Sequence, residues 1–291
     1  MVRAAAAPEG NLLGNVRAED DPLLNSAFVE TPDYRALART TDFHFVVGRR
    51  GTGKSALFAR LRAHLLDSGR IVTGEVPREH AALALQETLG ARGCDYQSAR
   101  ATSRLLWRSY ILRCVMRSIL VRYGFKLNSD AKAVAGALLG GESRCGPYEY
   151  ALDVLSNCSQ QHRLLANEVA RCVRIDEHSN LCRDMLQECK ANAVFLVDSL
   201  DEGWSPESLP TALLGGLARA AAELSDAQTG VHVVAFVRDN MFRALAHLDP
   251  DFSRNVEGAA LRLRWTEDTL LQLVAERIRR VKNVSTENNH E

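Results

Sequence analysis

One stretch of the chain combines residue types that suit the binding of a triphosphate. The pattern G-x-x-x-x-G-K-[ST] spans residues 48–55 and is formed by Gly48, Arg49, Arg50, Gly51, Thr52, Gly53, Lys54 and Ser55. Glycines let successive backbone N–H groups converge on one anion, while Lys54 adds a positive charge at the β- and γ-phosphates and Ser55 offers a hydroxyl ligand to Mg²⁺. The candidate nucleotide-binding residues are therefore Gly48, Gly51, Thr52, Gly53, Lys54 and Ser55.

Three carboxylates follow the apolar run at residues 193–197, namely Asp198, Asp201 and Glu202. An aspartate at the end of a buried strand can hold the Mg²⁺ that bridges the β- and γ-phosphates, so Asp198 joins Ser55 as a candidate metal ligand. Hydrolysis also needs a carboxylate that orients or deprotonates the attacking water, and Asp201 and Glu202 are both candidates. The alternative is that Asp201 and Glu202 only cap the segment that follows.

Arginines supply the remaining charge that could face a phosphate. Arg238 ends the apolar run at residues 231–237, and beside a γ-phosphate it would stabilise transition-state charge. It is equally compatible with a structural ion pair to Asp239 or Asp201. Arg49 and Arg50 could contact phosphate or a neighbouring subunit, although loop arginines are more often solvated.

Apolar periodicity predicts the elements that must position these residues. Continuous apolar runs indicate buried strands at residues 43–47, 70–76, 193–197, 231–237 and 260–263. Helical spacing is found at residues 33–40, 55–66, 102–123, 211–224 and 266–281. Strands separated by helices pair in parallel, so we expect an α/β fold with a doubly wound parallel sheet. Gly48, Asp198 and Arg238 would then share the edge at the carboxyl ends of the strands.

The order of these segments predicts four regions. Residues 1–40 form an N-terminal arm and a lead-in helix, and residues 41–80 together with 191–285 form the nucleotide core. Residues 81–190 are mainly helical and form a large insertion between the two parts of the core. Residues 286–291 are a polar tail, and we expect fraying over residues 281–291.

Composition narrows the class of protein. The 291 residues are 46% hydrophobic and 25% charged with a formal net charge of zero, which gives no support to a dedicated nucleic-acid binder. Seven scattered cysteines without a C-x-x-C pair favour free thiols in a reducing compartment. No signal peptide or membrane-spanning apolar run is present, so we expect a cytoplasmic protein without a membrane partner.

Taken together, these motifs resemble the STAND class of P-loop ATPases, which includes NACHT and KAP proteins and is related to AAA+ proteins. The loop at residues 48–55 is similar to their Walker A motif, and Asp198-Ser199-Leu200-Asp201-Glu202 is similar to their D-[GS]-L-D-E Walker B motif. The segment at residues 263–278 resembles the tryptophan-led helix that closes such modules in bacterial members. Ser199 replaces the glycine that is commonest in NACHT proteins, and the second acid that typifies AAA+ proteins is missing after Asp198.

The resemblance implies a P-loop NTPase fold and a slow ATPase that acts as a switch. Its cofactors would be ATP and Mg²⁺, and its partner would be an effector protein or further copies of the chain, in bacterial signalling or antiphage defence. Lys54 and Ser55 match the phosphate and Mg²⁺ positions, Asp198 the metal-associated acid, and Arg238 the sensor of the terminal phosphate. The preference for ATP over GTP rests on this resemblance and on the lack of an N-K-x-D motif.

Three other functions are compatible with the sequence. Arginine-rich helical segments, such as residues 104–122, would suit a DNA-associated ATPase of the AAA+ or origin-recognition kind. A non-hydrolytic assembly module would bind nucleotide structurally and contact its partner through the helical region. A small-molecule kinase is the weakest alternative, because no acceptor site is evident.

Overall fold

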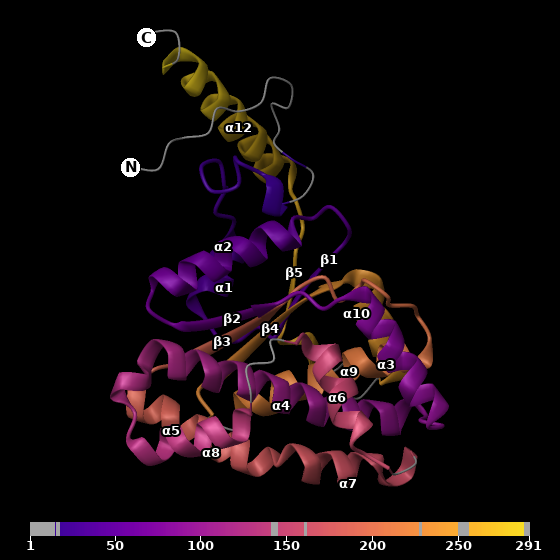
Figure 1. The fold of residues 1–291 in the computed structure, drawn as a ribbon. Coiled ribbons are helices and arrows are strands. Elements are labelled where there is room, and N and C mark those ends of the chain that lie inside the picture. Colours follow the sequence, from indigo (N-terminus) through magenta and orange to yellow (C-terminus); the bar gives the residue numbers. More distant parts are fainter. Residues whose placement is uncertain are drawn as a thin grey trace.

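The computed structural model describes residues 15, 18–140, 145–159, 162–226, 229–249 and 256–287. Most of the expected N-terminal arm, residues 1–14 and 16–17, and the end of the expected tail, residues 288–291, lie outside these residues. The described chain forms three layers, a central sheet with helices on both faces (Figure 1). The sheet has five strands in the order β2-β3-β4-β1-β5, and every neighbouring pair is parallel.

The strands lie close to the predicted runs. They are β1 (Phe45–Gly48), β2 (Ile71–Glu75), β3 (Ala193–Val197), β4 (Val231–Arg238) and β5 (Ala260–Arg262). Every residue of β1 and β3 is buried, as expected where helices cover both faces of a parallel sheet. The mixed α/β class and the parallel sheet expected from the sequence are thus confirmed.

One face of the sheet is covered by two helices close to the N-terminus. Thr31 caps α1 (Pro32–Arg39) by accepting a hydrogen bond from the Tyr34 N–H at 3.2 Å. The apolar residues of α2 (Lys54–Asp67) recur at helical spacing and pack on the sheet. Because α2 starts directly after the glycine-rich loop, this packing fixes where its N-terminus lies.

The other face carries the long helix α4 (Tyr96–Tyr123) and the helix α9 (Ser208–Asp226). The remaining helices around them are α3 (Glu79–Ala91), α5 (Ser129–Leu139), α6 (Pro147–Ser156), α7 (His162–Val173), α8 (Ile175–Cys189) and α10 (Asp239–Leu248). Figure 1 shows α7 and α8 beyond α4, on the side away from the sheet. These helices share one hydrophobic core with the sheet, so they form a thick layer on this face.

The helices α4 and α9 approach each other closely at Gly216. A Cβ atom at this position would lie 2.4 Å from the Ser103 Cβ and 2.7 Å from the Arg104 backbone N. Only a glycine therefore fits without a shift of one helix.

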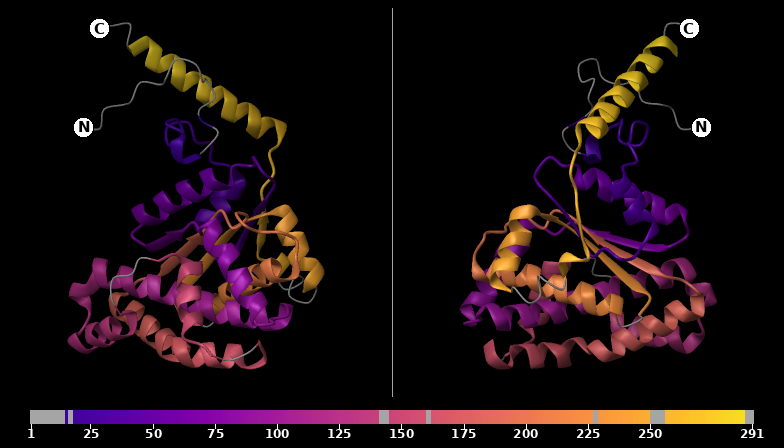
Figure 2. Two further views of the ribbon diagram at one scale, coloured as in Figure 1. Left: turned by 45° about the vertical axis from the view of Figure 1, so that its right-hand side comes forward. Right: turned by 180° about the vertical axis from the view of Figure 1, so that it is seen from behind.

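The helix α12 (Glu267–Glu287) is longer than expected and projects from the body of the molecule (Figure 2). The sequence predicted a helix over residues 266–281 with fraying beyond, and that boundary was wrong, because the helix continues for six residues. Its early turns expose Leu270 and Leu271. Among the residues that the structure describes, none of the helices combines the length and apolar character needed to cross a bilayer.

Candidate functional site

The glycine-rich loop connects the end of β1 to the start of α2. Gly51 and Gly53 have φ angles of 82° and 84°, which side chains other than glycine rarely adopt. At Gly48, a Cβ atom would lie 2.4 Å from the Thr52 Oγ1. Each of the three glycines therefore has a steric reason to be glycine. Gly53 occupies the N-cap of α2, so the first N–H groups of that helix lie beside the loop.

Lys54 is folded back over this loop. Its Nζ donates hydrogen bonds to the carbonyl oxygens of Gly48 and Arg49, at 3.2 and 3.1 Å. Burial lowers the pKa of Lys54, while the negative charges of Asp198 and Asp201 act in the opposite direction. The ammonium group is thus held near both the loop and the carboxylates.

Asp198 follows the last residue of β3 and is 4% exposed. The Ser55 hydroxyl and the Ser199 backbone lie beside its carboxyl group, and both act to lower its pKa. Burial has the largest effect and raises the pKa of Asp198, while these two polar groups and the charge of Lys54 offset part of that rise. Ser55 and Asp198 together form a pair of oxygen ligands of the kind that Mg²⁺ prefers.

The loop after β3 places Ser199 in the left-handed region, with φ 58°. This conformation is uncommon for a residue with a side chain. The sharp turn directs Asp198 toward Ser55 and brings Asp201 to the same edge of the sheet.

Arg238 forms an ion pair with Asp201. It lies at the end of β4, where it is in register with Gly48. Of the two structural partners considered for Arg238, Asp201 is thus the one observed, while Asp239 pairs with Arg243 and, at 3.4 Å, with Arg262. The ion pair holds Arg238 at the edge of the sheet where the glycine-rich loop begins.

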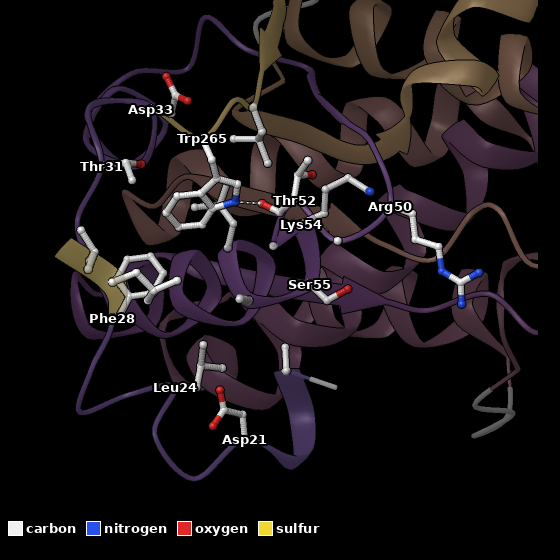
Figure 3. A pocket seen from close by; sticks show the side chains of 18 of the residues that line it. Asp21, Leu24, Phe28, Thr31, Asp33, Arg50, Thr52, Lys54, Ser55 and Trp265 are labelled. Carbon is white, nitrogen blue, oxygen red and sulfur yellow. Dashed lines mark hydrogen bonds between the residues drawn. The ribbon is translucent and has the colours of Figure 1, made fainter. Parts of the chain in front are cut away.

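Glu202 is exposed in the turn after Asp201, and within the described residues it makes no ion pair. Arg50 also lines the site, but it extends from the loop away from Ser55 (Figure 3). The two candidate bases thus differ, because the carboxylate of Asp201 is paired and that of Glu202 is open to solvent.

A cavity of about 760 Å³ unites these residues. All of the candidate residues except Gly48 line it: Gly51, Thr52, Gly53, Lys54, Ser55, Asp198, Asp201, Glu202 and Arg238. Residues 21–33, among them Leu24 and Phe28, form another wall of the cavity (Figure 3). Residues of α12 also line it. The volume lies in the range of ordinary small-molecule sites. Segments far apart in the sequence therefore build one site with a charged end and an apolar end.

Two contacts at this cavity were missed by sequence reasoning. Trp265 donates a hydrogen bond from Nε1 to the Thr52 carbonyl oxygen at 3.2 Å. Arg277 of α12 forms an ion pair with the buried Asp21 at 2.7 Å. In both pairs the partners are more than 200 residues apart, so no local pattern could indicate the contact.

Comparison with known proteins gives one extended similarity. The chain is 34% identical over 286 residues to a protein of Escherichia coli (strain K12) that is provisionally named the transposon gamma-delta 80.3 kDa protein. The alignment covers 93% of this chain and 40% of that protein, so the chain spans less than half of its relative. A second similarity, to Allergen Alt a 2 of Alternaria alternata, is 50% identical over 44 residues, or 15% of this chain and 23% of that protein. No family model and no solved structure matches.

Proposed function

We propose that this chain is a P-loop NTPase of the STAND type that binds ATP with Mg²⁺ and hydrolyses it slowly. The observation that carries the proposal is that Lys54, Ser55 and the buried Asp198 line one cavity at the carboxyl ends of parallel strands, near enough for Lys54 and Ser55 to act on the Asp198 carboxyl group. At this edge the positively charged loop would bind the triphosphate, and the buried acid would bind the metal ion that accompanies it.

Each residue has a role in this proposal. The N–H groups around Gly51 and Gly53 receive the phosphate oxygens, and Lys54 neutralises charge on the β- and γ-phosphates. Ser55 and Asp198 hold Mg²⁺, which supplies Lewis-acid stabilisation of the transferred phosphoryl group when bound.

The ion pair of Asp201 with Arg238 bears on the choice of base. While the pair persists, the Asp201 carboxylate is neutralised, and Glu202 is the carboxylate that can orient water. If a γ-phosphate draws Arg238 away, Asp201 is released to accept a proton. In this proposal Arg238 links the terminal phosphate to the base, and its ion pair with Asp201 supports that role.

Lys54→Ala tests the proposal directly. We expect the wild type to bind ATP in the presence of Mg²⁺ and to release phosphate slowly, and the variant to bind ATP about 10- to 100-fold more weakly, because a charge-assisted contact is lost. Isothermal titration calorimetry gives the affinity, and a phosphate-release assay gives the rate. Lys132→Ala, at an exposed position of α5, is the matched control and should behave as the wild type.

Equal binding of ATP by the wild type and Lys54→Ala would contradict the proposal. Tight binding without phosphate release would instead support a non-hydrolytic assembly module.

The similarity to a protein named for a transposon favours a second candidate, an ATPase that acts with DNA. The arginines that suggested it are engaged within the molecule, since Arg104 and Arg108 pair with Glu223 at 2.8 and 3.0 Å, and Arg113 donates to the Leu138 carbonyl at 2.6 Å. The helix α4 is therefore a poor candidate for a DNA-binding face. Affinity for duplex DNA that falls as salt rises would support this function, and no binding at low salt would remove it.

A further inference from the structure

We propose that Trp265 is a positioning residue of the glycine-rich loop, and that it couples the binding of a nucleotide at this loop to the position of α12. This inference rests on the proposed binding of a nucleoside triphosphate. Trp265 itself need not touch the nucleotide, because it acts on the backbone that does.

The contact between Trp265 and the loop has two parts. The indole Nε1–H donates to the Thr52 carbonyl oxygen at 3.2 Å, drawn as a dashed line in Figure 3. The ring also covers Gly53, where a Cβ atom would lie 3.9 Å from the Trp265 Cζ2. One side chain thus holds the peptide unit that joins Thr52 to Gly53.

Holding this carbonyl also aims the N–H group of the same peptide. A trans peptide is planar, so its C=O and N–H bonds point in opposite directions. With the Thr52 carbonyl directed at the indole, the Gly53 N–H is directed to the other side of the loop. Among the described residues this N–H has no hydrogen-bond acceptor, which leaves it available to an anion.

The peptides on either side of this one are held by other hydrogen bonds, from the Thr52 N–H to the Arg49 carbonyl at 3.3 Å and from the Leu57 N–H to the Gly53 carbonyl at 2.9 Å. Gly51 and Gly53 both have positive φ angles, and glycine backbones reorient readily. The Thr52 Oγ1 donates to the Arg49 carbonyl at 2.9 Å, which holds the Thr52 side chain but not the carbonyl of Thr52 itself. The indole hydrogen bond therefore holds the one peptide of this stretch, Thr52–Gly53, whose carbonyl the other bonds leave without a partner among the described residues.

Trp265 is joined closely to α12, which begins two residues later. Thr266 and Thr269 cap the helix reciprocally, with the Thr266 N–H bonded to the Thr269 Oγ1 at 3.0 Å and the Thr269 N–H to the Thr266 Oγ1 at 3.3 Å. Further along, Arg277 is paired with Asp21 on the opposite wall of the cavity. A change at the loop is thus transmitted to α12 through Trp265.

The variant Trp265→Phe tests the inference, because it keeps an aromatic ring over Gly53 and removes the N–H donor. We expect it to bind ATP with Mg²⁺ about three- to tenfold more weakly than the wild type, the range for loss of one neutral hydrogen bond. The matched control is Trp204→Phe, since the Trp204 indole does not line the cavity and its Nε1 has no partner in the described part of the chain. Calorimetry gives both affinities, and thermal unfolding shows that both variants are folded.

Tryptophan fluorescence provides a readout that a merely structural role would not change. ATP should alter the emission of the wild type and of Trp204→Phe, and this response should be lost in Trp265→Phe at saturating ATP. Wild-type affinity of Trp265→Phe, or an ATP response that survives in it unchanged, would overturn the inference while the proposed function stands. If the wild type and Lys54→Ala both fail to bind ATP, the proposed function fails and this inference fails with it.

Discussion

Asp198 affects the stability of the fold differently in the ligand-free protein and in the proposed complex with Mg²⁺ and nucleotide. Its carboxyl group is buried, and burial is the main reason that its pKa is raised. An ionised carboxylate in this place is unfavourable until a cation compensates it, and Lys54 and a bound Mg²⁺ would both do so. The residue that the proposed chemistry needs is therefore one that weakens the fold when the site is empty.

Asp198→Asn should separate these two effects. Because the folded-state pKa of Asp198 is raised, its contribution to stability is fully present below the unfolded value of 3.8 and is lost as the pH rises through the folded value. The amide has no such loss, so at pH 7 the ligand-free variant should melt at a higher temperature than the wild type. Phosphate release should fall about 10- to 100-fold because the Mg²⁺ site is damaged.

The measurements for Asp198→Asn are thermal unfolding from pH 3 to 8 and phosphate release with Mg²⁺. Asp184→Asn, at an exposed position of α8, is the control and should change neither quantity. A lower melting temperature for Asp198→Asn at pH 7, with Asp184→Asn unchanged, would show that ionised Asp198 stabilises the empty protein.

At the scale of the element, the geometry of the loop depends on where α2 begins. The helix starts at Lys54 because Gly53 has a left-handed conformation, so the helix cannot extend further toward the N-terminus. The packing of Leu57, Leu61 and Leu65 then holds α2 against the sheet. The N–H groups at the start of α2 are thereby presented at a fixed distance from the end of β1.

Gly53→Ala should disturb this start of α2. A Cβ at φ 84° is strained, so the free energy of unfolding should fall by about 1–2 kcal/mol, and ATP binding should weaken with it. Gly136→Ala is the matched control, since Gly136 lies in α5 with open space around it and no positive φ, and it should gain about 0.5–1 kcal/mol. Urea unfolding measures both, and equal effects of the two substitutions would contradict the argument.

At the scale of the whole molecule, an ion-pair network around one buried carboxylate joins the helices on the thick face of the sheet. Asp249, just after α10, is paired with Arg100 of α4 and with Arg219 of α9, the latter at 3.3 Å. Its side chain is 9% exposed. Three helices from distant parts of the chain are thus held by one carboxylate, and two of them, α9 and α10, pack on β4, which ends at Arg238.

Asp249→Ala should therefore destabilise the protein strongly. Removal of the carboxylate takes the shared partner from two partly exposed guanidinium groups, and the expected loss is about 1.5–3 kcal/mol. Glu177→Ala breaks the exposed pair with Arg174 and should change the free energy of unfolding by less than about 0.5 kcal/mol. Urea unfolding tests both, and a loss below 1 kcal/mol for Asp249→Ala would show that the network contributes little.

Much of the fold and of the charged end of the site could be predicted because it depends on contiguous segments. Three features are local sequence patterns: the loop at residues 48–55, the apolar runs that end at Asp198 and Arg238, and the helix after Lys54. Each pattern predicts one kind of local structure. Parallel pairing follows from the alternation of strands and helices, and it places these strand ends at one edge.

The remaining features arise from contacts between segments that are far apart in the chain. The pairing of Arg238 with Asp201 rather than Asp239, the indole of Trp265 on the Thr52 carbonyl and the ion pair of Arg277 with Asp21 have no signature in neighbouring residues. Side-chain partners of this kind depend on how the layers pack, because several arginines and carboxylates satisfy the same local pattern. Hydrophobic periodicity specifies which face of an element is buried, but only the packed molecule selects which charges meet across the cavity.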